Sequence, residues 1–327
     1  MKNIQAELKK GISRLYLLYG DEPYLINKNA EILREAIVGG DTTGMNETVI
    51  EGKAAMPDVI ANAMNTLPFF NDRRLVILKN TGLFAAGRKD DTEKTTKLIR
   101  DIPETTVLVF QENDVDKRLK LFKAAETAGT VFVCGTPSES ELVKWIQALS
   151  EENGKTIDGA TAAYLLRVVN GGMDEVRLEL MKLISYSEEK LDKREIDEIC
   201  TKSPESQVFD LVRAVGNKRP AVAVDILSNL VLLKESPVMV IALIARQLRM
   251  LIQCGALLEE KRSAAEISSA LGLRDFIARE YIAQCRSFST EQLRQAIFEL
   301  LETDYSIKSG RMEDKTAVEL WIIKHAG

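Results

Sequence analysis

The sequence predicts an α/β domain with a parallel sheet and flanking helices, followed by a region built from helices alone. Three observations lead to this prediction. The first 140 residues alternate between short apolar runs and helical patterns. The runs LVIL, TVLVF and VFV are continuously apolar, which is typical of strands that helices cover on both faces. Beyond Cys134, apolar residues recur with the helical period and no convincing strand is found.

The first domain begins with a strand at Leu15–Tyr19, which ends in the turn Gly20-Asp21-Glu22-Pro23. The next helix is expected to have one apolar face, formed by Leu25, Ile26, Ala30, Leu33 and Ile37. Further strands are expected at Thr48–Ile50, Leu75–Leu78, Thr106–Phe110 and Val131–Val133. Helices between them include Pro57–Thr66 and Lys117–Ala128. Such alternation indicates parallel strands that are joined by helical crossovers.

The helical region begins after the turn-rich segment Gly135-Thr136-Pro137-Ser138, where Ser138 can cap a helix that starts near Glu139. Ser203-Pro204 and Gly216–Pro220 are expected to interrupt helices. We expect helices at 139–152, 158–169, 174–185, 193–200, 205–218, 220–233, 237–259, 264–271, 274–286, 290–308 and 313–325. These breaks place one domain boundary near residue 140 and a second near residue 210.

Composition narrows the class of protein. The chain has 327 residues, of which 45% are hydrophobic and 28% charged, the ordinary balance of a soluble globular protein with two or three domains. The net charge is −5, so no global basic field is available to hold nucleic acid. Any contact with DNA is therefore expected from a local basic patch or from neighbouring subunits.

Cysteine, histidine and N-terminal patterns exclude several kinds of site. The four cysteines form no C-x-x-C pair and have no zinc spacing, so we expect reduced and mostly buried thiols: Cys134, Cys200, Cys254 and Cys285. The single histidine, His325, is expected to be exposed, which argues against a catalytic triad or a multi-histidine metal site.

Neither targeting nor membrane insertion is expected. The segment MKNIQAELKKG lacks the apolar core of a signal peptide. The longest apolar run, Val238–Ala245, is much shorter than the roughly 20 residues that a membrane span needs. We therefore expect a cytoplasmic protein.

The turn after the first strand lies where a phosphate-binding loop belongs, yet its residues do not suit phosphate. Such a loop requires G-x-x-x-x-G-K-[ST], and the turn at 20–26 has no second glycine, no lysine and no hydroxyl at that spacing. Asp21 and Glu22 would repel a triphosphate, and Pro23 has no amide hydrogen to donate. The strand Thr106–Phe110 is followed by Gln111-Glu112, with glutamine where a metal-holding aspartate would stand. Together, both defects indicate an ATPase-like fold that lacks a nucleotide-hydrolysing site.

A second glycine-lysine-threonine sequence occurs at Gly154-Lys155-Thr156, but Leu149 stands where its first glycine would be needed. A helix rather than a strand precedes it. We therefore interpret Gly154 as a helix-ending glycine followed by a surface turn.

Four segments carry a resemblance to a known family. They are LYLLYGDEPYLI at 15–26, LPFFNDRRLVIL at 67–78, GGMDEVRLELMKL at 171–183, and the stretch at 271–323 that contains Asp304 and Ile307-Lys308-Ser309-Gly310. In these segments the chain resembles the delta subunit family of bacterial DNA polymerase III. The similarity covers both ends and the centre, and the first and last segments are its most specific parts.

The resemblance implies three domains and a role without catalysis. It implies an AAA+-like α/β clamp-binding domain at 1–140 without a functional phosphate loop, a small helical lid domain at 141–210, and a helical collar domain for oligomerisation at 211–327. The implied partners are the beta sliding clamp, the delta-prime and gamma/tau clamp-loader subunits, and primer-template DNA through the complex. The implied function is to bind and open the clamp within the DNA-directed DNA polymerase holoenzyme, a nucleotidyltransferase, with no cofactor or metal of its own.

Within this family, a hydrophobic tip at the position of LPFF inserts into a pocket on the clamp, so the resemblance gives that role to Leu67, Phe69 and Phe70. Pro68 would restrict the backbone and reduce the entropy cost of binding. From the residues alone the alternative is that both phenylalanines pack inside their own domain, because most aromatic residues beside a strand belong to the core.

Two other hypotheses concern charged residues. Lys117, Arg118, Lys120 and Lys123 form a basic cluster on an expected helix and could contact the DNA backbone, although such clusters are usually solvated faces. The alternatives to the delta function are an active AAA+ ATPase of the same superfamily, or an unrelated α/β enzyme that uses carboxylates such as Asp21 and Glu22. Those two neighbouring carboxylates more naturally serve as charges at the positive, N-terminal end of the following helix.

Overall fold

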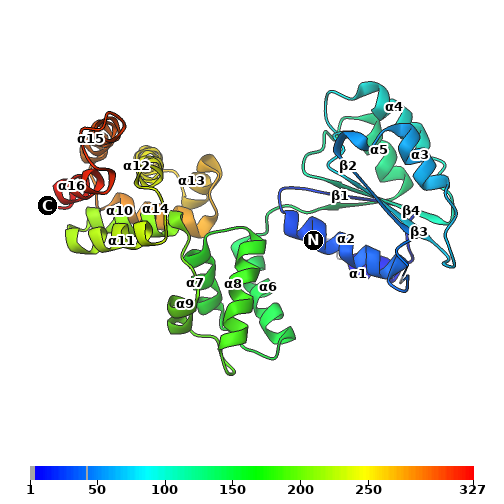
Figure 1. Ribbon diagram of the computed structural model, residues 1–327, viewed down its shortest axis with the longest axis horizontal. Coiled ribbons are helices and arrows are strands. Elements are labelled where there is room, and N and C mark those ends of the chain that lie inside the picture. Colours follow the sequence, from blue (N-terminus) through cyan, green and yellow to red (C-terminus); the bar gives the residue numbers. More distant parts are fainter. Residues whose placement is uncertain (1–3, 42) are drawn as a thin grey trace. The chain divides into compact units, whose positions relative to one another are not determined.

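The computed structural model describes residues 4–41 and 43–327, which divide into two compact units, the first ending at Thr136 and the second spanning Pro137–Gly327 (Figure 1). The first three residues of the N-terminal segment MKNIQAELKKG therefore lie outside the described part. The segment that follows them forms a short helix, α1 (Ile4–Leu8), whose Ile4 is buried. The predicted division of the helical region into lid and collar domains stays a prediction.

The first unit contains a parallel five-stranded sheet with the order β2-β3-β4-β1-β5. All five expected strands are present. Their bounds are β1 (Leu15–Tyr19), β2 (Glu47–Glu51), β3 (Arg74–Lys79), β4 (Thr106–Glu112) and β5 (Thr130–Val133). Strands β1, β3 and β4 are buried along almost their whole length, as their unbroken apolar runs predicted.

Helices cover the sheet on both faces (Figure 1). Helix α2 (Pro23–Val38) and α1 pack on one face, where Leu33 joins a core with Leu18 and Val109. On the other face lie α3 (Pro57–Asn65), α4 (Lys89–Leu98) and α5 (Lys120–Ala128), and a short 3₁₀ turn η1 (Gly52–Ala54) precedes α3. That second core includes Leu17 and Phe110.

The second unit is helical, as the sequence predicted, and its helices begin and end within one or two residues of the expected positions. They are α6 (Glu139–Glu152), α7 (Gly159–Val169), α8 (Met173–Tyr186), α9 (Lys193–Ile199), α10 (Pro204–Gly216), α11 (Pro220–Leu232), α12 (Pro237–Glu259), α13 (Ala264–Leu271), α14 (Asp275–Cys285), α15 (Thr290–Lys308) and α16 (Asp314–Ala326). The predicted cap is confirmed, because Ser138 and Glu141 form a capping box at the start of α6.

Gly154 lies in the turn that ends α6 and has a positive φ of 71°, a conformation that suits glycine, so its interpretation as a helix-ending glycine is confirmed. The surface turn expected after it is not present, because Thr156 forms a parallel β-bridge with Lys190. The Lys155 ammonium is bound to the backbone carbonyls of Ser187 and Glu188. It therefore has a structural role in joining two loops of the second unit.

Helix α12 is long and apolar enough to cross a membrane by length and composition alone. In the structure it is the central helix of the second unit, packed against α10, α14 and α15. Its Ile244 and Leu251 are fully buried in one continuous core with Val212 of α10 and Trp321 of α16. Long apolar helices of this kind are common in the cores of globular proteins, so we interpret α12 as a core helix.

The expectation that His325 is exposed was wrong. Helix α16 continues to Ala326, so the imidazole lies against Trp321 and only 14% of the side chain is exposed. Its Nε2 lies 3.0 Å from a carboxylate oxygen of Glu299. The cysteines follow the prediction more closely, because Cys134, Cys200 and Cys254 are buried thiols and Cys285 is partly buried.

Candidate interaction site

The three residues predicted to dock on a partner lie in the connection between α3 and β3. There the chain leaves the helix at Thr66, turns through residues 67–73 and enters the sheet at Arg74. Leu67 is 77% exposed, Phe69 48% and Phe70 96%. The structure therefore excludes the alternative that these side chains form part of their own domain's core. We call residues 67–70 the tip.

The backbone of the tip adopts a conformation that is rare for a bulky residue. Phe70 has a φ of 48°, in the left-handed region that glycine and asparagine usually occupy. The rings of Phe69 and Phe70 meet edge to face, with their centroids 4.5 Å apart. A non-glycine residue in this region costs of order 1–3 kcal/mol and persists only where surrounding contacts hold it.

The side chain of Asn46 supplies such contacts. Its Nδ2 donates to the Phe69 carbonyl at 2.9 Å, and its Oδ1 accepts from the Phe69 amide at 2.6 Å. Asn46 is only 1% exposed and precedes β2. Sequence reasoning did not identify this residue, because its partner lies 23 positions away and no local pattern marks the pairing.

Arg74 contacts the opposite flank of the tip from the first position of β3. Its guanidinium donates to the Thr66 carbonyl at 3.3 Å and to the Thr48 hydroxyl at 2.7 Å. Burial lowers the pKa of Arg74, because desolvation disfavours the charged form. The two flanks of the tip are thus held by buried side chains, while its apolar groups face solvent.

The turn after β1 lies at the opposite, carboxyl end of the sheet, and its amides are bonded to the chain itself. The Gly20 amide donates to the Glu112 carbonyl at 3.2 Å, and the Glu22 amide to the Cys134 carbonyl at 3.0 Å. The Glu22 carboxylate accepts from the Tyr24 amide at 3.3 Å and caps α2. A carboxylate therefore occupies the helix terminus where a phosphate would bind in a nucleotide site.

Next to this turn, Gln111 and Glu112 end β4 and are both buried. The Glu112 carboxylate accepts from the Thr81 hydroxyl, from the Thr81 amide at 3.0 Å and from the Gly82 amide at 3.4 Å. Burial raises the pKa of Glu112, and these hydrogen bonds oppose the increase. The carboxylate thus holds the loop after β3. Among the described residues, no group of three or more His, Cys, Asp or Glu side chains could hold a metal ion.

The predicted basic cluster is exposed, but it does not lie on a single helix. Helix α5 begins at Lys120, so Lys117 and Arg118 belong to the preceding turn, and the expected start of this helix at Lys117 was wrong. Arg118 pairs with Asp116 at 2.8 Å, and this contact lowers the pKa of Asp116 to about 2. Lys117 lies over the Tyr19 ring. Lys120 and Lys123 are also exposed, and a role of the cluster in DNA contact stays a prediction.

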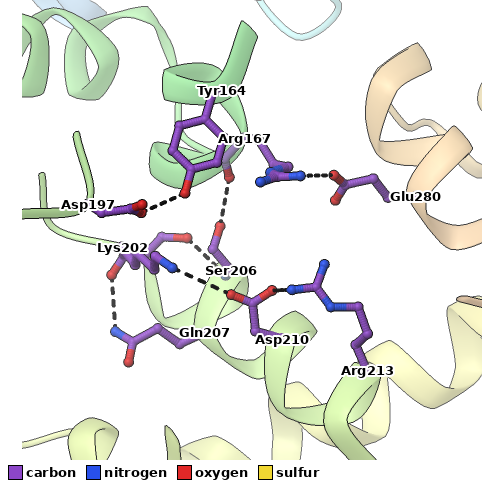
Figure 2. Close-up of polar contacts among 10 residues, drawn as sticks. Tyr164, Arg167, Asp197, Lys202, Ser206, Gln207, Asp210, Arg213 and Glu280 are labelled. Atoms are coloured by element: carbon purple, nitrogen blue, oxygen red, sulfur yellow. Dashed lines mark hydrogen bonds and ion pairs between the residues drawn. The ribbon is translucent and has the colours of Figure 1, made fainter. Parts of the chain in front are cut away.

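Figure 2 shows a group of charged side chains in the second unit that the sequence did not predict. Arg167 of α7 pairs with Glu280 of α14 at 3.2 Å, and Asp210 of α10 pairs with Arg213 and Lys202. These residues line a hollow of about 480 Å³. The Arg167–Glu280 pair joins α7 to α14, and the Ser206 hydroxyl joins α10 to α7 by donating to the Arg167 carbonyl at 3.1 Å. Because each of these three cations has a carboxylate partner, we interpret the group as structural.

Helices α12 and α15 form an apolar groove of about 640 Å³. Phe298 and Leu301 line it and are well exposed, and Met239 on α12 is also exposed. Exposed apolar residues of this size on adjacent helices are typical of a surface that another protein covers.

Two sequence models of one protein family match the chain. The model described as "DNA polymerase III, delta subunit" matches residues 16–135. The model described as "DNA polymerase III delta subunit, C-terminal domain" matches residues 205–325. Together they cover the sheet of the first unit and helices α10–α16 of the second.

Curated relatives and a solved structure agree with these matches over nearly the full length. The chain is 28% identical to "DNA polymerase III subunit delta" of Bacillus subtilis, with 98% of this chain and 96% of the relative aligned. It is 22% identical to "DNA polymerase III subunit delta" of Escherichia coli, with 94% and 90% aligned. The structure of the "Bacillus subtilis DNA clamp loader delta protein" superposes with a TM-score of 0.74 and 26% identity, over 99% of this chain and 98% of that one.

Proposed function

Because the chain belongs to the DNA polymerase III delta subunit family and is a clamp-loader component, we propose that it binds the beta sliding clamp through its tip and opens it. The single observation that carries this proposal is the exposed apolar tip, with Phe70 96% exposed and held in an unfavourable backbone conformation. Exposed apolar side chains that cluster on one ordered turn are suited to insertion into an apolar pocket on a partner protein.

Burial of the tip offers enough free energy for a specific contact. Transfer of one phenylalanine from water into an apolar pocket contributes about 1.5–3 kcal/mol. The free protein already holds the backbone at Thr66 and Phe69 through Arg74 and Asn46, which reduces the backbone entropy that is lost on binding.

Clamp opening follows if the tip binds the open clamp better than the closed one, because a ligand shifts an equilibrium only by its differential affinity for the two states. The delta chain then acts as a wedge that stabilises the open form. Its access to the clamp is governed by the nucleotide state of the gamma/tau subunits, which hydrolyse ATP. Primer-template DNA enters through the assembled complex.

The turn at 20–26 supports a role without nucleotide hydrolysis by this chain. Its amides bind the chain's own carbonyl groups, and the Glu22 carboxylate caps α2 in the place of a phosphate. This geometry favours the non-catalytic function over both alternatives, the active ATPase and the carboxylate enzyme. A carboxylate enzyme of that kind would need Glu22 to be accessible to a substrate, but this side chain is only 4% exposed.

The exposed apolar side chains of α12 and α15 support a collar contact with the delta-prime and gamma/tau subunits. Phe298 and Leu301 are 60% and 65% exposed. Residues 211–327 would then form the collar domain, residues 141–210 the lid and residues 1–140 the clamp-binding domain, in a complex that works in the cytoplasm. The basic cluster at Lys117 and Lys120 remains a candidate DNA contact within that complex.

The test is a binding measurement between the full-length chain and the cognate beta clamp. We expect Phe69→Ala combined with Phe70→Ala to weaken clamp binding by about 100-fold or more, because two anchors are lost. The matched control is Phe298→Ala, which removes another exposed phenylalanine, from the second unit, and should leave clamp affinity unchanged. Unchanged affinity in the tip double variant would refute the assignment.

A further inference from the structure

We propose that Asn46 is a positioning residue for clamp binding, whose buried amide holds the tip in the conformation that presents both phenylalanine rings. This inference rests on the proposed function, since it concerns how the same tip is kept competent. Asn46 itself is 1% exposed, so it acts through Phe69 without contacting a partner.

The carboxamide of Asn46 bonds to Phe69 as a neighbouring β-strand would, with one donor and one acceptor. One carboxamide both donates to the Phe69 carbonyl at 2.9 Å and accepts from the Phe69 amide at 2.6 Å. Both polar backbone groups of Phe69 are therefore satisfied by a single side chain. Only asparagine and glutamine offer a donor and an acceptor side by side, and glutamine is one methylene too long for this spacing.

Asn46 is itself fixed on its other side. Its Nδ2 also donates to the Asp41 carboxylate at 2.9 Å, and its backbone amide donates to the same carboxylate at 2.9 Å. Its carbonyl accepts from the Leu75 amide at 2.7 Å, which ties it to β3. The Thr43 hydroxyl and the amides of Asn46 keep the pKa of Asp41 well below its usual range, so this carboxylate is ionised at neutral pH.

The bracing matters because Phe70, the next residue, has a φ of 48°. A phenylalanine that is not held there relaxes to a negative φ, and its ring then points in another direction. The apparent affinity of a partner is reduced by the fraction of molecules in the competent conformation. If loss of the brace leaves about one tenth of the molecules competent, clamp binding weakens about tenfold.

The experiment compares Asn46→Ala in the wild-type chain with Asn46→Ala in the Phe69→Ala/Phe70→Ala background, using the full-length chain and the cognate beta clamp. We expect about 5- to 20-fold weaker clamp binding in the wild-type background and no further loss in the background without the rings. The matched control is Thr92→Ala. It removes another buried hydrogen bond, from the Thr92 hydroxyl to the Leu83 carbonyl, beyond the opposite end of β3.

A direct readout of the tip keeps the proposal testable if Asn46→Ala lowers stability. Hydrogen exchange of the Phe69 amide should become faster in Asn46→Ala and remain slow in Thr92→Ala. The milder variant Asp41→Ala removes the carboxylate that supports Asn46, together with its bonds to Thr43, and keeps the Asn46–Phe69 contact itself. It should weaken clamp binding by about two- to fivefold, again only when the rings are present.

The outcomes separate this inference from the proposed function. If the wild-type chain does not bind the clamp, the proposed function fails. If the double ring variant loses binding while Asn46→Ala and Asp41→Ala both retain wild-type affinity, the tip docks without this brace and the inference is wrong. Equal loss of affinity in Thr92→Ala would also overturn it, because the effect would then follow general stability.

Discussion

Replacement of Phe70 by glycine should weaken clamp binding and raise the stability of the folded chain. The ring is 96% exposed and meets Phe69 edge to face within the tip, so its removal costs the folded chain almost nothing. In a partner pocket the same ring contributes about 1.5–3 kcal/mol, which corresponds to a loss of about 10- to 150-fold in affinity. The backbone φ of 48° gives glycine an additional advantage at this position.

We therefore expect Phe70→Gly to raise the free energy of unfolding by up to about 1 kcal/mol, because relief of the left-handed strain exceeds the entropy cost of glycine. Phe70→Ala should leave stability unchanged, since alanine keeps the strained Cβ. Both variants should bind the clamp about 10- to 150-fold more weakly by calorimetric titration. Urea denaturation measures stability, with Phe84→Ala, a fully buried ring, as the control that must be destabilised. A clear loss of stability in Phe70→Gly would refute the reasoning, because the ring would then pack against its own domain.

Three further predictions follow from other parts of the molecule. Glu22→Ala should lower the stability of the first unit by about 1 kcal/mol through loss of the α2 cap, and equilibrium dialysis should detect no specific ATP binding before or after the change. Burial lowers the pKa of His325, so the unfolded chain binds the proton more readily. Stability should fall as pH decreases below about 6.5, and His325→Gln should reduce this fall in urea denaturation at pH 7.5 and 5.5. Ile244→Ala, in the core of the second unit, should cost about 2–5 kcal/mol by the same assay; a negligible loss would contradict the role of α12 as a core helix.

The sheet and most helices could be predicted from the sequence because their signals are local. Continuous apolar runs marked the buried strands, and Ser138 marked the start of α6. Helix α4 gave no such signal, because its buried face consists of Thr92, Thr95 and Thr96 instead of large apolar residues. Threonine counts as a polar residue when apolar periodicity is sought, so this face gives no helical signal. Its methyl group nevertheless packs well, and its hydroxyl can donate to a backbone carbonyl, as Thr92 does to Leu83.

The candidate site was predicted only in part, because exposure is a tertiary property. The residues alone favoured a core position for Phe69 and Phe70, and only the family resemblance gave Leu67, Phe69 and Phe70 the role of surface anchors. Their exposure depends on the turn conformation at Phe70, and Asn46 holds that turn from 23 positions away. The pairing of Arg167 with Glu280 spans 113 positions and was equally invisible to local patterns.

Clamp opening itself can be measured most directly with two fluorophores placed across one interface of the cognate beta clamp. We expect the wild-type chain to separate the fluorophores and reduce their energy transfer without added ATP. The Phe69→Ala/Phe70→Ala chain should leave the transfer unchanged at concentrations that saturate the wild-type response. Full opening by the double variant, or no opening by the wild-type chain when it is bound to the clamp, would contradict the account.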